Sequence, residues 1–182
     1  MPDSAKGSLL ILAGPPGAGK STIAKQLAKT SERPCCHLHA DSFYTAIRKG
    51  YVPPYLPEAQ RQNEVVIGVV TEAAAGYARG GYDVVLDGIV GPWFLPPFQA
   101  MRDKERIELH YVVLRPSLEE TLGRAASREG RVLKEVEPIK GLYRAFADLG
   151  RLEAHVVDSS AQSVAETTAA IRSAVALGKF KL

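Results

Sequence analysis

A run of nine residues near the start of the chain has the types and spacing of a phosphate-binding loop. The run fits G-x-x-x-x-G-K-[ST] and consists of Gly14, Pro15, Pro16, Gly17, Ala18, Gly19, Lys20, Ser21 and Thr22. Glycines lack a Cβ, so the backbone can approach a polyphosphate closely, and the loop amides and a following helix N-terminus point at the anion. Lys20 supplies a positive charge for the outer phosphates, and the Ser21 hydroxyl is placed to ligate Mg²⁺.

The sequence on either side of the loop predicts the elements that hold it. Residues 8–13 form a short apolar run that is typical of a buried strand. Residues 20–30 predict a helix with Ile23, Ala24 and Leu27 on one face. A strand, a glycine turn and a helix are the context that this motif requires. A glycine-rich turn that matches by chance is the alternative.

The rest of the chain predicts strands that alternate with helices. Further strands are expected at 36–40, 83–87, 107–114 and 155–158, and helices at 42–48, 57–79, 96–104, from 117, 137–149 and 163–177. In the helix at 57–79, Val65, Val66, Val69 and Val70 are expected on the inner side. The alternation predicts a parallel sheet covered on both faces, with ligands at the carboxyl ends of its strands.

Several strands end in a polar residue, which could place these side chains in one cleft. The residues are Asp41, Asp87, Arg115 and Asp158. Asp87 follows the apolar run 84–86, and this pattern is typical of the carboxylate that holds the Mg²⁺ shell beside a phosphate-binding loop. A cap on the following turn is the alternative for Asp87. Asp41 could be the N-cap of a short helix, the base that takes a proton from an acceptor hydroxyl, or both.

Two further groups of residues are candidates for the same cleft. Arg124, Arg128 and Arg131, with Lys134, form a basic cluster that could close over a triphosphate, and a solvated charged face is the alternative. On the acceptor side, the loop after Asp87 holds the single tryptophan, Trp93, which could be a pocket wall or core filler. Tyr44, Arg48 and Tyr51 could line the opposite wall.

Composition limits the class of protein. The length of 182 residues suits one domain over 1–182, and the formal net charge of +3 does not by itself indicate a nucleic-acid or membrane partner. The polar start and the short apolar run after it fit neither a signal peptide nor a transmembrane span, so a cytoplasmic location is expected. Cys35 and Cys36 are adjacent; reduced thiols are the favoured interpretation, and a zinc site with His37 and His39 is the alternative.

With these residues in view, the sequence resembles the small P-loop kinases of the nucleoside-monophosphate-kinase-like fold. It is most similar to the gluconate kinase, chloramphenicol phosphotransferase and polynucleotide kinase branch, the AAA-type small ATPase-like kinases. The resemblance covers nearly the whole chain and rests on residues 14–22, on Asp41, on Asp87-Gly88 and on the three arginines. It implies a three-layer α/β fold whose five-stranded parallel sheet has the order 2-3-1-4-5, with helices on both faces and a helical lid at about 124–150.

The resemblance also implies roles for single residues. Asp41 would be the catalytic base, Arg124 would lie near the adenine, and Arg128 or Arg131 would contact the phosphates. Adenylate-kinase-like enzymes follow the Asp-Gly of the third strand with Pro-Arg, and the arginine grips the acceptor phosphate. Here residues 89–93 contain no arginine, so the resemblance favours an uncharged acceptor with a hydroxyl, although Arg48 or Arg61 could supply the missing charge.

We therefore interpret the chain as an ATP-dependent phosphotransferase that uses Mg²⁺ and moves the γ-phosphate to a hydroxyl of a small molecule. Asp41, Tyr44, Arg48 and Trp93 would bind the acceptor, and Ser21 and Asp87 the metal. A nucleoside-monophosphate kinase and a polynucleotide 5′-kinase are alternatives, although low aromatic content and small charge disfavour nucleic acid. An ATP-binding regulatory switch without an acceptor is an alternative of another class. The acceptor, ATP versus GTP, monomer versus dimer, and the arginine on the phosphates stay open.

Overall fold

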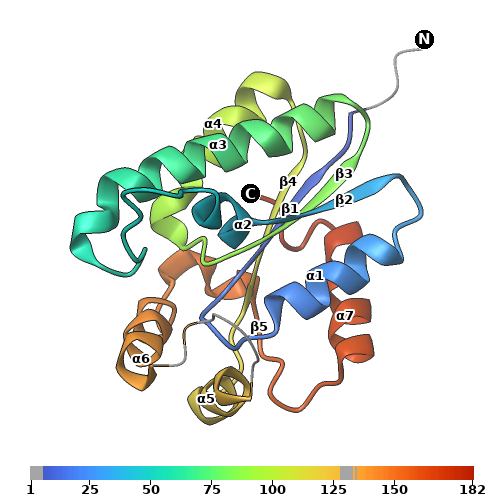
Figure 1. Ribbon diagram of the computed structural model, residues 1–182. Coiled ribbons are helices and arrows are strands. Elements are labelled where there is room, and N and C mark those ends of the chain that lie inside the picture. Colours follow the sequence, from blue (N-terminus) through green and yellow to red (C-terminus); the bar gives the residue numbers. More distant parts are fainter. Residues whose placement is uncertain (1–5, 128–132, 134) are drawn as a thin grey trace.

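In a computed structural model of the chain, five parallel strands form a sheet in the order β2-β3-β1-β4-β5 (Figure 1). The structure describes residues 6–127, 133 and 135–182. The strands are β1 (Leu9–Ala13), β2 (Cys35–His39), β3 (Asp83–Asp87), β4 (Leu109–Leu114) and β5 (Val156–Val157). This topology confirms the predicted P-loop fold with strand order 2-3-1-4-5.

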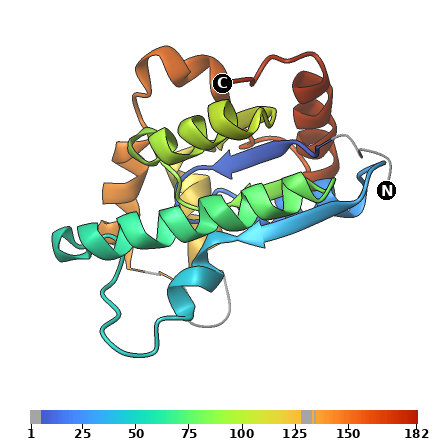
Figure 2. The same ribbon diagram turned by 90° about the horizontal axis from the view of Figure 1, so that it is seen from above.

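Helices cover both faces of the sheet. They are α1 (Lys20–Lys29), α2 (Ala40–Thr45), α3 (Gln60–Arg79), α4 (Leu95–Glu105), α5 (Leu118–Ala126), α6 (Val136–Ala145) and α7 (Val164–Ala176). Figures 1 and 2 show α3 and α4 over one face and α1 and α7 over the other. Short 3₁₀ segments precede α3 and α4, at Pro57–Ala59 and Pro92–Phe94, and a third lies at Gly150–His155.

The alternation of side chains along β1 builds two separate cores. Leu9, Ile11 and Ala13 pack into the core under α3 and α4, whereas Leu10 and Leu12 pack into the core under α1 and α7. All five residues are buried because β1 lies in the middle of the sheet with a helix layer on each side. The central strand that leads into the phosphate-binding loop is therefore fixed from both faces.

Helix α3 corrects one detail of the predicted core. Val66 and Val70 are buried as expected, but Val65 and Val69 are about half exposed, at 49% and 53%. With 3.6 residues per turn, the buried stripe of α3 runs from Val66 and Ile67 through Val70 to Ala74. Val65 and Val69 each precede a residue of this stripe by one position and face outward. Both exposed valines were wrongly assigned to the inner side.

The predicted element boundaries differ from the observed ones mainly at the ends. The expected helix at 57–79 begins as the 3₁₀ turn Pro57–Ala59 before α3, and the one at 137–149 ends at Ala145. Strand β4 begins at Leu109 rather than residue 107, because Arg106 adopts a left-handed conformation with φ of 53° that ends α4 and redirects the chain. Within the described ranges, no helix has the length and apolar character needed to span a membrane.

Candidate functional site

The phosphate-binding loop connects the carboxyl end of β1 to α1, as its motif predicts. Two of its glycines are required by close packing. A Cβ on Gly14 would lie 2.2 Å from the Leu114 carbonyl oxygen, and a Cβ on Gly17 would lie 2.3 Å from that of Thr121. A Cβ on Gly19, where φ is 90°, would meet no atom of the described residues within 4 Å apart from its chain neighbours. The loop is thus seated tightly against β4 and α5, and it is open on the Gly19 side.

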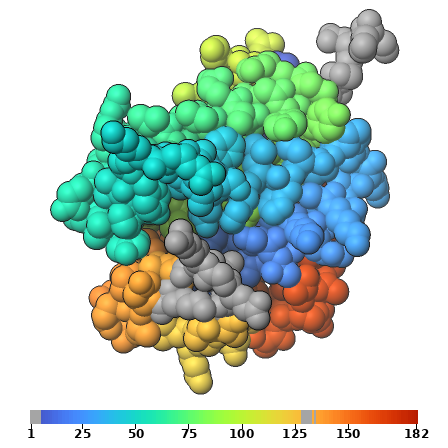
Figure 3. All heavy atoms as spheres, viewed as in Figure 1, coloured from blue at the N-terminus to red at the C-terminus, as the bar shows by residue number. Residues whose placement is uncertain are grey.

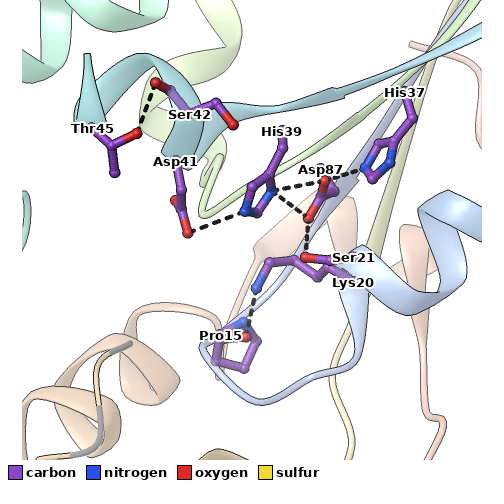
Figure 4. A network of polar contacts seen from close by, with 9 residues as sticks. All are labelled: Pro15, Lys20, Ser21, His37, His39, Asp41, Ser42, Thr45 and Asp87. Carbon is purple, nitrogen blue, oxygen red and sulfur yellow. Dashed lines mark hydrogen bonds and ion pairs between the residues drawn. The ribbon is translucent and has the colours of Figure 1, made fainter. Parts of the chain in front are cut away.

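Lys20 and Ser21 begin α1 and aim in different directions (Figure 4). The Lys20 Nζ reaches back across the loop and donates to the Pro15 carbonyl at 2.8 Å. The Ser21 hydroxyl instead points toward β3 and donates to Asp87 Oδ2 at 2.6 Å. The ammonium therefore lies over the loop, where it could meet phosphate, while the hydroxyl lies beside a carboxylate that could share a metal with it.

Asp87 is the centre of a buried polar network at the end of β3. Its side chain has no solvent exposure, and it accepts hydrogen bonds from Ser21, from His37 Nε2 at 2.5 Å and from His39 Nδ1 at 3.0 Å. Burial alone would raise its pKa, but the bonds from His37, His39 and Ser21 outweigh burial and hold the pKa below its ordinary value. Asp87 is therefore an ionised carboxylate beside the loop, not a cap on the following turn.

Sequence reasoning considered His37 and His39 only as zinc ligands and missed their contacts with Asp87. The two residues alternate along β2, so both rings lie on the same face, and the register pairs His39 with Asp87 directly. The period of two in His37-Leu38-His39 could have placed both rings on one face of the strand, but it could not have identified Asp87 as their partner. Cys35 and Cys36 are free thiols, and no cluster of three or more metal-ligating side chains occurs in the described part of the chain.

Asp41 lies just beyond the same network. Its Oδ2 is 3.7 Å from His39 Nε2, within ion-pair range, so the His39 ring stands between two carboxylates (Figure 4). The hydrogen bond to Asp87 is the largest cause that raises the pKa of His39; burial opposes it, the charges of Asp87 and Asp41 add to it, and that of Lys20 opposes it. Asp41 and Lys20 thus both lie close enough to His39 to affect its charge.

The structure corrects one predicted role of Asp41. It is not an N-cap, because α2 begins at Ala40 and its N-cap is His39, which makes no side-chain capping bond. Asp41 instead lies in the first helical turn, where a carboxylate is favoured by the helix dipole. Its side chain is 66% exposed, so this carboxylate, unlike Asp87, can be reached from solvent.

Two tyrosines, Tyr44 and Tyr51, lie near Asp41. Burial raises the pKa of Tyr44 to about 12, and the negative charges of Asp41 and Tyr51 add to this effect. Burial also raises the pKa of Tyr51, again with a contribution from Asp41, so both phenols lie near this carboxylate. Arg48 is exposed on the segment between them.

Trp93 lies on the turn that follows β3 and is only partly covered. Its ring is 5.7 Å from that of Phe146 and 6.0 Å from that of Phe94, yet 48% of the residue is exposed. A Cβ on Gly91 would lie 2.3 Å from the Trp93 ring, so Gly91 makes room for it. Trp93 is thus not core filler, and its exposed surface is available as a pocket wall.

Of the predicted basic cluster, Arg124 is the one member within the described residues. Arg124, on α5, pairs with Glu120 at 3.2 Å and donates to the Ser159 carbonyl at 3.2 Å. It therefore ties α5 to the loop after β5, beside the phosphate-binding loop. Arg128, Arg131 and Lys134 lie outside the described residues. Figure 3 shows α5 and α6 on one side of this face and the segment that follows β2 on the other.

Two of the polar residues that follow strands, Arg115 and Asp158, do not join the network around Asp87. Arg115, after β4, forms a two-bond ion pair with Glu153 at 2.8 and 2.9 Å and donates to the Phe146 carbonyl. Asp158, after β5, accepts bonds from the backbone and hydroxyl of Ser160. Both side chains are engaged in holding their own loops, so only the ends of β1, β2 and β3 converge on one network.

Comparisons with known proteins agree with this fold. A family model described as an AAA domain (AAA_33) matches residues 9–138. No curated protein sequence matches the chain.

Three solved structures illustrate the structural likeness. A gluconokinase from Sinorhizobium meliloti 1021 has 20% identity and a TM-score of 0.63, over 96% of this chain and 98% of that chain. The tunicamycin resistance protein of Deinococcus radiodurans has 15% identity and a TM-score of 0.68, over 97% and 98%. The APS kinase of Mycobacterium tuberculosis has 15% identity and a TM-score of 0.68, over 94% and 98%. These likenesses share the fold, and because the family model spans more than half of the residues, the chain belongs to the AAA domain family.

Proposed function

We propose that the chain is an ATP-dependent phosphotransferase that transfers the γ-phosphate to a hydroxyl of a small molecule. The observation that carries this proposal is the pair of carboxylates formed by Asp87, at the end of β3, and Asp41, in the first turn of the helix that follows β2. Asp87 is buried, ionised and bonded to the loop serine, whereas Asp41 is exposed and separated from Asp87 only by the His39 ring. One carboxylate suits a metal and the other suits an acceptor.

The donor side fits a magnesium–nucleotide complex. Ser21 and Asp87 offer oxygen ligands 2.6 Å apart, and such hard donors match Mg²⁺. When bound, this ion neutralises charge on the β- and γ-phosphates. The loop amides and the N-terminus of α1 would bind the phosphates, and Lys20 would add a positive charge. The APS kinase structure cited above is a complex with AMPPNP, which supports an adenine nucleotide here.

The acceptor side fits a hydroxyl compound. Asp41 would accept the proton of the attacking hydroxyl and orient it toward the γ-phosphate, a role that is typically worth ~10²–10⁴ in rate. Tyr44 and Tyr51 offer partly exposed aromatic surface near that carboxylate, and the half-exposed ring of Trp93, on the turn after β3, would form a further wall. Arg124 would lie near the adenine, and the lid arginines Arg128 and Arg131 would exclude water and stabilise the transferred group.

The test is transfer of label from γ-labelled MgATP into a panel of hydroxyl compounds. The panel holds gluconate, shikimate, aminoglycosides, chloramphenicol, nucleosides, nucleoside monophosphates and 5′-hydroxyl oligonucleotides. We expect label in one small-molecule acceptor and at least about a 10²-fold loss with Asp41→Asn. Asp103→Asn is the matched control, because it makes the same change on an exposed carboxylate of α4, and it should keep full transfer.

Other results of the same assay would contradict the proposal. Label in a nucleoside monophosphate or an oligonucleotide would identify one of the two other kinase classes. Label that reaches only water, at equal rates with and without Asp41→Asn, would remove the catalytic role of Asp41. That result would favour an ATP-binding switch without an acceptor.

A further inference from the structure

Three polar side chains occupy alternate positions where β2 runs into α2, namely His37, His39 and Asp41. His37 and His39 both contact Asp87, but only His39 also reaches Asp41 (Figure 4). The His39 ring uses its two nitrogens in different directions: Nδ1 faces both oxygens of Asp87 at 3.0 and 3.1 Å, and Nε2 faces Asp41 at 3.7 Å. The ring is therefore a physical link between the metal-side and the acceptor-side carboxylates.

The Asp87 end of this link is rigid. Asp87 has no solvent exposure, and Ser21 and His37 hold it in addition to His39. The backbone register of β2 and β3 places His39 directly opposite Asp87. A ring held at Nδ1 by a buried, immobile carboxylate has little freedom to turn, so the position of its Nε2 is fixed relative to the phosphate-binding loop.

The Asp41 carboxylate depends on the His39 contact for a fixed position. Asp41 is 66% exposed and lies on a helix of only six residues. In the described ranges, His39 is the one residue recorded within hydrogen-bonding or ion-pair range of its carboxylate. An exposed aspartate with no partner samples several staggered χ1 rotamers. A catalytic carboxylate that is misplaced by about 1 Å loses much of its effect, on the order of 10²-fold.

We propose that His39 is a positioning residue that holds the Asp41 carboxylate in register with the metal-side carboxylate Asp87. The inference rests on the proposed function, because it takes Asp41 to act on the acceptor. His39 touches neither nucleotide nor acceptor in this role, and it acts through Asp41. His37 serves as the comparison, because it contacts the same Asp87 oxygen from the same strand and does not reach Asp41.

The first test measures the order of Asp41 directly and needs no acceptor. His39→Asn is the informative variant, because an asparagine amide can take the place of imidazole Nδ1 beside Asp87 but leaves nothing at the position of Nε2. Three-bond NMR couplings would report χ1 of Asp41 in protein saturated with MgADP. We expect one dominant rotamer in the wild type and in His37→Gln, whose amide can take the place of the His37 Nε2 beside Asp87, and rotamer averaging in His39→Asn. Averaging in the wild type, or one rotamer in His39→Asn, would overturn the proposal.

The second test is a double-mutant cycle in the transfer assay with the same acceptor panel. We expect His39→Asn to lower transfer by about ten- to a hundred-fold, with MgADP affinity unchanged within about threefold. In an Asp41→Asn background it should lower transfer by less than about twofold, because nothing is left to position. An equal loss in both backgrounds would show that His39 acts independently of Asp41 and would overturn this proposal alone.

The two tests separate failure of the inference from failure of the proposed function. If Asp41→Asn leaves transfer unchanged, the proposed role of Asp41 fails, while the χ1 couplings still report whether His39 orders its side chain. Where Asp41→Asn transfers no measurable label, the χ1 couplings decide.

Discussion

Asp87 ends β3 and Asp41 follows the end of the neighbouring strand β2 by two residues, yet the surroundings of the two carboxylates differ. Asp87 has no solvent exposure and accepts bonds from three side chains, and those bonds lower its pKa against the effect of burial. Asp41 is 66% exposed, and its one partner among the described residues is His39 Nε2 at 3.7 Å. A buried carboxylate needs every one of its partners, because an unpaired charge away from water is costly, whereas an exposed one is solvated and can be used by a ligand. The site therefore has a carboxylate that its neighbours hold in place, Asp87, and a carboxylate that a ligand can reach, Asp41.

The largest expected difference between Asp87 and Asp41 is in stability, measured after each carboxylate is removed in turn. Asp87→Ala leaves Ser21, His37 and His39 without their shared acceptor, so we expect a loss of about 3 kcal/mol in the free energy of unfolding. Asp41→Ala should change it by less than about 0.5 kcal/mol, as is usual for exposed positions. Urea unfolding followed by circular dichroism measures both. Equal losses for the two variants would show that burial does not distinguish the two carboxylates.

The same contrast explains what the sequence could and could not predict. The loop at residues 14–22 and Asp87 could be predicted because phosphate and Mg²⁺ binding requires these residue types, and because each follows an apolar run that is typical of a buried strand. The contacts of His37 and His39 with Asp87 could not, because they depend on the register between β2 and β3. Arg115 was expected at the site but pairs with Glu153, from a segment 38 residues later in the chain. Long-range partners of this kind leave no local pattern.

Acceptor binding should weaken when the exposed aromatic surface near the site is lost. Trp93→Ala removes a half-exposed ring beside the turn after β3, and we expect the KM of the acceptor found in the transfer assay to rise about tenfold, with MgADP affinity unchanged. Tyr77→Ala is the matched control, because Tyr77 is 46% exposed but lies on α3. A tenfold weaker affinity for MgADP in Trp93→Ala would place Trp93 on the nucleotide side instead.

The smallest expected effect concerns the carboxylate that holds Arg115 away from the site. Hydrogen bonds from Arg115 and from the Leu149 amide lower the pKa of Glu153 from its ordinary value of 4.5 to about 2. Ionised Glu153 therefore adds stability above pH 4.5, and this contribution is lost as the pH falls toward about 2. We expect Glu153→Gln to lower Tm at pH 7 by a few degrees, and the difference from the wild type to shrink as the pH falls below about 4.5.

Thermal unfolding of both proteins from pH 7 down to about pH 3 measures this difference. Glu137→Gln is the control, because the Glu137 side chain is 73% exposed and, within the described residues, its ion-pair partner is Lys140; such surface pairs contribute little. A Tm difference for Glu153→Gln that stays constant over the whole range would mean that the ion pair with Arg115 contributes nothing. In that case the Phe146 and Ala147 carbonyls, rather than Glu153, would be the interactions that hold the Arg115 guanidinium in place.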